Sequence, residues 1–374
     1  CISERCSLLT VGTEHEYSLN DADLVPLPIA DRVIESIHGT VVNEFNFGDI
    51  NVSKELQKHV IELVPATPHT SLASMERALF DGLTRFRQAT SGRYSMLGLG
   101  MHPFLALDRT TWWDHEDIDI YQVYDRLFNL RQHGWLNIQA LQVNVHYDGE
   151  ENMVEMFDRM RSLMPFLVAV TASSPMVEGR LTGVMDNRLL YYRQNQSRVP
   201  LICNNMIPER LSSKRQHNDI LESIYAELRD IGGHELCHEW IDSRGVVIRP
   251  HRECLELKAC DEQECLRSDM AVTAFVLSLL RADLDLEDDR DSLLDMNEAA
   301  IRSGTSSCRP ELLRLYDRAF EAATAEERSY LPLIRKRIEE GSVAEIVSAR
   351  IRDGEGAVDV FKELASRLAE NRPL

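Results

Sequence analysis

The sequence predicts an α+β protein in which an antiparallel sheet carries helices on one face and a helical region follows it. Segments of strand and helix character are interleaved as far as residue 282, and their irregular order fits neither a TIM barrel nor a Rossmann unit. Residues 136–149 alternate apolar and polar side chains, as expected for a strand with one buried face. Residues 283–374 have helical character throughout. We therefore predict one domain over residues 1–282 and a helical C-terminal region over residues 283–374 that packs on it.

Strands are predicted where apolar residues alternate with polar ones or form short runs. A sheet that carries helices on one face can leave its other face open to a ligand. The segment 55–65 is also consistent with a helix, although its ending VIELV favours a strand. The predicted strands cover residues 8–19, 40–47, 55–65, 94–103, 136–149, 245–250 and 253–261.

Helices are predicted from apolar periodicity and from capping residues. Ser71 is the expected N-cap of a helix over residues 71–90, and Gly92 follows its end. Residues 181–199 are polar and arginine-rich without a strong period, so we expect a loop over a site. The remaining predicted helices cover residues 28–37, 152–173, 220–231 and 266–283, and breaks in the C-terminal region are expected at Gly304, Pro332, Gly341 and Gly354.

Composition and the absence of certain motifs exclude several classes of protein. A net charge of −20 argues against nucleic-acid binding, because phosphate contacts need a surplus of Lys and Arg. No apolar run approaches the roughly 20 residues that span a bilayer, and the first residues lack the basic and apolar regions of a signal peptide. The eight cysteines include no CxxC pair, which indicates reduced thiols in a cytoplasmic protein. A P-loop and a GxGxxG turn are both absent, so a nucleotide site would have to consist of carboxylates and arginines on a sheet.

Acidic side chains at two places point to a cation site. Glu14 and Glu16 are two apart on a predicted strand and share a face, so their like charges favour a cation between them. Magnesium is the natural guest, because it prefers carboxylate oxygens together with water and phosphates. Glu62 is a single acid within an apolar strand, and taken alone such an acid is usually an edge residue or an ion-pair partner. For Glu14 and Glu16 the alternative is a solvated strand face.

Two further strands and one loop carry groups that suit metal or phosphate. Asn144 and His146 share a face of one strand, although a lone strand histidine is more often structural. In the strand 253–261, Cys254, Glu256, Lys258 and Cys260 are expected on one face, with Arg249 and Arg252 just upstream. Carboxylates beside cations are the arrangement that phosphoryl transfer needs. Arg188, in the predicted loop, can clasp a carboxylate or phosphate, or can belong to an ordinary solvated loop.

Together these segments resemble the type-2 glutamate–cysteine ligases, also called carboxylate–amine ligases. Seven motifs occur in the family's order over nearly the whole chain, so chance is a poor explanation. The matching segments are VGTEHEY, KELQKHVIELVPAT, GMHP, QVNVHYDG, MPFLVAVTASSPMVEGRLTGVMDNR, ECLELKACDEQEC and MNEAAIRSG.

The resemblance implies a glutamine-synthetase-like fold, with the domain over residues 1–282 as the catalytic one, and a ligase that uses ATP and Mg²⁺. ATP would phosphorylate the γ-carboxylate of glutamate, and an amine such as cysteine would attack the acyl phosphate. Matched to the family's motifs, the metal ligands are Glu14, Glu16, Glu62, His146 and Glu256. The predicted catalytic residues are Glu16, Arg188 and Lys258, and the predicted ATP-binding residues are Arg249, Arg252, Lys258 and Asn144.

Two departures from the family pattern bear on the substrate. Lys258 stands where arginine is usual, and lysine cannot make the planar fork of a guanidinium. Asn144 stands where a histidine is usual. The alternatives are a ligase for another carboxylate or amine, a kinase of the same fold and a non-catalytic metabolite-binding regulator. The expected partners are small molecules, with no nucleic acid and no membrane, and a homodimer is left open.

Overall fold

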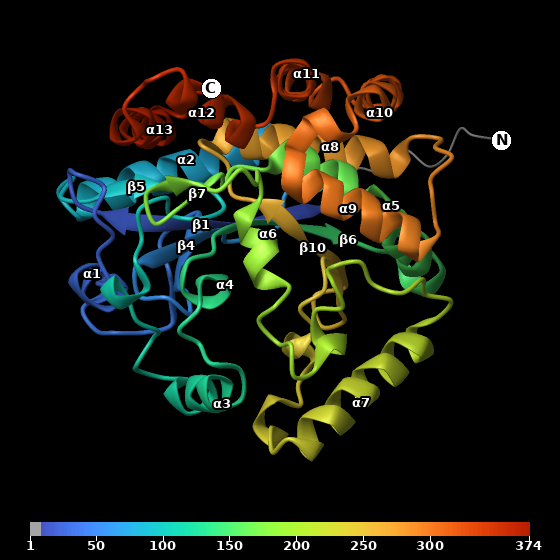
Figure 1. The fold of residues 1–374 in the computed structure, drawn as a ribbon, viewed down its shortest axis with the longest axis horizontal. Helices are drawn as coiled ribbons and strands as arrows, with labels where there is room; N and C mark the ends of the chain where they lie inside the picture. Colours follow the sequence, from blue (N-terminus) through green and yellow to red (C-terminus); the bar gives the residue numbers. More distant parts are fainter. Residues whose placement is uncertain (1–8) are drawn as a thin grey trace.

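A computed structural model describes residues 9–374 of the chain, and its centre is an eight-stranded antiparallel sheet (Figure 1). The strand order is β2-β3-β4-β1-β6-β10-β9, and β5 pairs with β1 outside this path. A separate hairpin of β7 and β8 lies off the sheet. The strands are β1 Val11–Asn20, β2 Glu44–Asn46, β3 Ile50–Lys54, β4 Val60–Pro65, β5 Ser95–Leu97, β6 Ala140–His146, β7 Met176–Val177, β8 Arg180–Leu181, β9 Val246–Arg249 and β10 Cys254–Asp261.

The sheet has one apolar and one polar face because its central strands alternate. On β1, Val11, Tyr17 and Leu19 belong to the main hydrophobic core, whereas Glu14 and Glu16 point to the other face. The antiparallel register places Glu16 opposite Glu62 of β4, Glu14 opposite Gln142 of β6, and Glu256 of β10 opposite Asn144 of β6. Pairing of four strands therefore brings the polar residues of distant segments onto one surface.

Helices cover the apolar face in two layers. The helices next to the sheet are α2, α5 and α8, and the C-terminal helices lie on or beyond them (Figure 1). One continuous core joins these layers, from Leu141 and Val143 in the sheet to Leu312 and Ile334 in the outer helices. The boundary at residue 282 remains a prediction. The helices are α2 Leu72–Ala89, α5 Gly149–Thr171, α8 Leu266–Arg281, α9 Arg290–Ser303, α10 Arg309–Ala322, α11 Leu331–Glu340, α12 Val343–Arg352 and α13 Ala357–Glu370.

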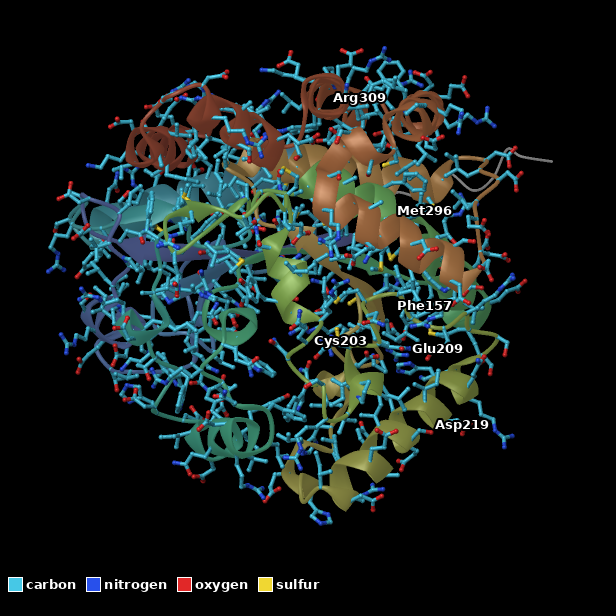
Figure 2. All side chains as sticks on the ribbon, in the orientation of Figure 1. Phe157, Cys203, Glu209, Asp219, Met296 and Arg309 are labelled. Carbon is cyan, nitrogen blue, oxygen red and sulfur yellow. The ribbon has the colours of Figure 1, made fainter. Side chains whose placement is uncertain are left out.

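The polar face is flanked by a further set of helices. They are α1 Ala30–His38, α3 Ile118–Phe128, α4 His133–Leu136, α6 Asn187–Tyr192 and α7 Lys214–Asp230 (Figure 1). A second hydrophobic cluster, which includes Tyr124, Trp135 and Ile224, joins α3, α4 and α7. Asp219 is exposed on the outer side of α7 (Figure 2). Short 3₁₀ turns lie at Leu107–Arg109, Pro200–Ile202, His234–Leu236, Glu239–Ile241, Gly304–Ser307 and Glu327–Ser329.

Most predicted elements are present, and the differences have local causes. The prediction of a loop over residues 181–199 is wrong in part, because Asp186 caps the short helix α6 through the backbone N–H of Leu189. Pro332 does not break a helix; it occupies the first turn of α11, where its missing N–H is tolerated. Strand β5 ends at Leu97, well short of the predicted residue 103. The helices α3 and α4 were not predicted.

Two observations concern the predictions about thiols and membranes. The cysteines among the described residues, Cys203, Cys237, Cys254, Cys260, Cys265 and Cys308, are free. Cys1, Cys6 and the start of the chain used for the signal-peptide prediction lie outside the described residues. Among residues 9–374, no helix combines the length and the apolar character needed to cross a membrane.

Candidate active site

Two adjoining cavities open on the polar face of the sheet. The first, of about 470 Å³, lies over β1, β4, β6 and β10. The second, of about 610 Å³, lies farther along the same strands. Glu14, Glu62 and Arg252 line both cavities. The polar residues brought together by strand pairing therefore form a continuous site of two compartments that meet at these three side chains.

Three carboxylates converge at the floor of the first cavity. One ligand oxygen from each of Glu16, Glu55 and Glu62 lies within 4.8 Å of the others. Glu16 accepts hydrogen bonds from the backbone N–H of Ala140 at 2.9 Å and from Gln142 Nε2 at 3.1 Å. These bonds fix the Glu16 carboxylate beside the two others.

The three carboxylates repel one another as long as no cation lies between them. Burial, followed by the charge of Glu55, raises the pKa of Glu16 well above its usual range. Burial together with Glu14 and Glu55 does the same to the pKa of Glu62, and burial raises the pKa of Glu55 against the charge of Lys54. A divalent cation would remove this repulsion, and converging carboxylate oxygens are the donors that Mg²⁺ prefers. The residues present therefore fit the predicted metal.

The sequence analysis missed Glu55. This residue follows the end of β3 and lies within the motif KELQKHVIELVPAT, whose only assigned ligand was Glu62. Glu14, by contrast, lies at the edge of the carboxylate group. It accepts hydrogen bonds from Asn144 Nδ2 and from Arg252 Nη1, each at 3.1 Å. Asn144 and Arg252, both predicted to bind ATP, thus contact a predicted metal ligand.

Glu256 belongs to a second group, in which cations surround one carboxylate. Arg249 Nε lies 2.6 Å from Glu256 Oε2, and Lys258 Nζ lies 2.8 Å from Glu256 Oε1. Burial would raise the pKa of Glu256, but Lys258 and Arg249 outweigh it and lower that pKa to about 2. The structure brings Glu256 to these two cations and not to the three converging carboxylates, so its role as a metal ligand remains a prediction.

Arg188 reaches the same cavity from the first turn of α6. Its Nε donates to Asp261 Oδ1 at 2.6 Å, and its Nη1 donates to the carbonyl oxygen of Lys258 at 3.2 Å. Its Nη2 is buried and has no hydrogen-bond partner in the described part of the chain, and Arg188 lines the cavity. A guanidinium held on two sides with a free N–H is suited to a substrate carboxylate or phosphate.

A β-bulge in β10 explains the position of Asp261 and corrects one prediction. The register with β6 shifts between Leu257 and Cys260, so Cys260 pairs with Leu141 and joins the apolar core. The prediction that Cys260 shares a face with Glu256 and Lys258 is therefore wrong. The extra residue turns Asp261 toward Arg188.

His146 lies on the polar face but apart from the three carboxylates. It is exposed and lines the second cavity, next to Asn144 and Cys254. The structure thus places His146 and the three carboxylates in different compartments. Its role as a metal ligand remains a prediction.

Solved structures of ligases share this fold. The glutamate–cysteine ligase of Francisella tularensis, solved in complex with AMP, superposes with a TM-score of 0.70 at 11% identity, over 97% of this chain and 88% of that one. A bifunctional glutathione synthetase from Pasteurella multocida gives a TM-score of 0.64 at 14% identity, over 97% of this chain and 52% of that one. At such identities the likeness establishes the fold, and it confirms the predicted α+β architecture with an antiparallel sheet.

Sequence comparison defines the family. The family described as glutamate-cysteine ligase family 2 matches residues 10–363. A protein of Archaeoglobus fulgidus, described as uncharacterized, is 45% identical over 96% of this chain and 99% of its own length. The Nocardia farcinica protein named "Putative glutamate–cysteine ligase 2-2" is 25% identical over 74% of this chain and 67% of its own length. A Rhodococcus jostii protein of the same name is 28% identical over 50% of this chain and 48% of its own length.

The chain belongs to glutamate-cysteine ligase family 2. This result confirms the resemblance found in the sequence and the prediction of a ligase that forms a C–N bond.

Proposed function

We propose that this protein is an ATP- and magnesium-dependent ligase that joins the γ-carboxylate of glutamate to an amine. The observation that carries the proposal is one cavity lined by two groups of opposite charge. Three converging carboxylates, Glu16, Glu55 and Glu62, line it together with the cations Arg188 and Lys258. Such a site can hold a metal and an anionic substrate at the same time.

The proposed reaction has two steps. An oxygen of the substrate carboxylate attacks the γ-phosphorus of ATP, the bond to the bridging oxygen breaks, and ADP leaves. The amine then attacks the acyl carbon, loses a proton and displaces phosphate, which leaves an amide. Bound magnesium would offset the negative charge of the phosphates.

The residues of the chain have distinct tasks in this scheme. The three carboxylates would hold magnesium. Lys258, fixed by Glu256, would offset charge on the transferred phosphoryl group. Arg188, fixed by Asp261, would orient the acid substrate through its free Nη2. Both cations are braced before substrate binds, so little reorganisation is needed.

Relatives in the family bear the name glutamate–cysteine ligase 2, which supports glutamate as the acid and makes cysteine the first amine to test. The decisive experiment measures ADP release by the purified protein with Mg-ATP and glutamate, with and without each of a panel of amines. The ligase predicts ADP release that depends on an amine and equals amide formed. ADP release with a stable phosphorylated product and no amine would favour a kinase, and no ADP release with any pair would favour a regulator.

A further inference from the structure

One side of the first cavity is apolar and aromatic. Segments outside the main sheet supply it, and its side chains are Leu56, Trp135, Ile138, Tyr192 and Trp240. We call this set the aromatic wall. Neither metal nor phosphate binding needs such a surface, so it suits a planar or apolar part of a substrate, either the side group of the amine or the base of ATP.

The indole of Trp240 lines the cavity. Its side chain remains 40% exposed, which is unusual for a large apolar residue in this protein. The ring is braced on two sides: His238 stacks with it at a centroid distance of 5.6 Å and an angle of 17°, and Tyr124 lies 6.0 Å away. A braced ring that keeps 40% of its surface exposed can still contact a planar or apolar group of a ligand.

Trp135 provides the second, independent observation. It is only 7% exposed, packs against Tyr124 at 5.2 Å and lines the same cavity. Its Nε1 is buried and has no hydrogen-bond partner among residues 9–374. A buried N–H without an acceptor is unfavourable, so a ligand acceptor that reached this N–H would stabilise the complex.

A carboxylate beside the aromatic wall bears on whether the amine or ATP binds there. Glu239 adjoins Trp240 in the chain and also lines the cavity. Its carboxylate, 3.8 Å from His251 Nε2, attracts a protonated amine, whereas Arg249 and Lys258 elsewhere in the lining attract the phosphates of a nucleotide. A cation close to an indole face is attracted further by the ring.

We propose that the aromatic wall binds the amine substrate and that this amine carries a planar aromatic or bulky apolar group, which stacks on Trp240. The inference rests on the proposed ligase function and defines its amine. Neither methylamine nor the thiol of cysteine offers a planar face to Trp240.

The test compares four amines, tyramine, phenethylamine, cysteine and methylamine, in the ADP-release assay with Mg-ATP and glutamate. We expect kcat/KM for the two aromatic amines to exceed that for methylamine and cysteine at least tenfold. Trp240→Ala should lower kcat/KM for tyramine about tenfold, through KM more than through kcat, in line with the energy of aromatic stacking. Trp240→Phe should restore most of that loss. Phe320→Ala is the matched control, because Phe320 is 39% exposed on α10, outside both cavities.

Two outcomes of this assay would overturn the inference, and a third case needs a separate measurement. One is a preference for cysteine or methylamine. Another is a rise in the KM of ATP, and not of tyramine, in Trp240→Ala, which would place a nucleobase on the wall. The third case is that the protein turns over none of the amines. Binding of tyramine, measured by calorimetric titration, then tests the aromatic wall. Binding that Trp240→Ala abolishes would retain the wall as an amine site although the ligase proposal fails, and absence of binding would remove both.

Discussion

Lys258 Nζ lies 2.8 Å from Glu256 Oε1, two residues away on the same face of β10. Arg249 holds the other oxygen of this carboxylate, so both oxygens of Glu256 already have cationic partners. The pair also explains why a lysine can stand where the family usually has an arginine. Glu256 and Arg249 supply the fixed geometry, and Lys258 needs to supply only a positive charge toward the cavity.

Substitutions of Lys258 should therefore separate the effect of its positive charge on turnover from the effect of its side-chain geometry. Lys258→Met should lower turnover by roughly 100- to 1,000-fold, the usual loss when one electrostatic donor at a reacting centre is removed. Lys258→Arg should retain most activity or change substrate preference. The measurement is ADP release, with Lys336→Met, an exposed lysine of α11, as the control. Turnover of Lys258→Met within twofold of the wild type would exclude a role for this charge.

The three converging carboxylates should make stability depend on magnesium and on pH. Because the pKa values of Glu16 and Glu62 are raised in the folded state, the metal-free protein loses stability as pH rises from about 4.5, where unfolded carboxylates ionise. Magnesium should reverse that loss, so its effect on Tm should be larger at pH 8 than at pH 5. At 100 times its Kd the gain is about 2.7 kcal/mol.

A single amide substitution tests the assignment of this site. Glu62→Gln should raise the Tm of the metal-free protein at pH 8 and remove most of the shift caused by magnesium. Glu311→Gln, which changes a half-buried carboxylate on α10 outside both cavities, should do neither. Differential scanning fluorimetry across a magnesium series provides the measurement. A full magnesium shift in Glu62→Gln would rule out this carboxylate as a ligand.

Local pattern was enough to predict some of the site. Glu14 and Glu16 follow the two-residue period of a strand, and Glu62 interrupts an apolar run, so each stands out within a few residues. Glu55 does not, because it lies just past the end of β3 and reaches the other carboxylates only when β3, β4 and β1 pair. Its position depends on tertiary structure and not on a local period.

The same distinction between local pattern and tertiary structure explains the predictions that were wrong. Cys260 was assigned to the polar face because strict alternation was assumed, and a one-residue bulge against β6 reverses every face beyond it. Arg188 was expected in a loop, since α6 is only six residues long and its N-cap, Asp186, looks like an ordinary loop residue. The aromatic wall combines segments around Trp135 and Trp240, which are about 100 positions apart, so no sequence window contains it.

The buried ion pair between Arg188 and Asp261 should be important for both stability and activity. Asp261→Asn removes the partner of a guanidinium that is almost fully buried, and breaking such a pair costs about 3–5 kcal/mol. We expect a clear fall in Tm and a fall in kcat, because Arg188 loses its orientation. Asp288→Asn breaks the exposed pair with Arg210 and should change stability by about 1 kcal/mol or less. Unfolding in urea and ADP release check both expectations.

His15 lies directly behind the site, on the apolar side of β1, and should control stability at alkaline pH. Its Nδ1 lies 3.3 Å from Glu262 Oε1 and 3.5 Å from Asp269 Oδ2. Burial would lower the pKa of His15, but the two acids outweigh it and raise that pKa to about 10. Because the folded-state pKa is the higher one, the stabilisation is fully present below the unfolded pKa of about 6.5 and is lost as pH rises through about 10.

His15→Gln should therefore destabilise the protein most at neutral pH. We expect a loss of about 3–5 kcal/mol at pH 7, the usual result of removing one partner from a buried ion pair. The difference from the wild type should shrink as pH approaches 10, whereas His234→Gln, an exposed substitution, should show no such trend. Urea unfolding at a series of pH values is the measurement. Glu262 also accepts the backbone N–H of Glu16 at 3.3 Å, so loss of the contact between His15 and Glu262 should weaken magnesium binding as well. A pH-independent loss in His15→Gln would mean that the histidine stabilises β1 by packing alone.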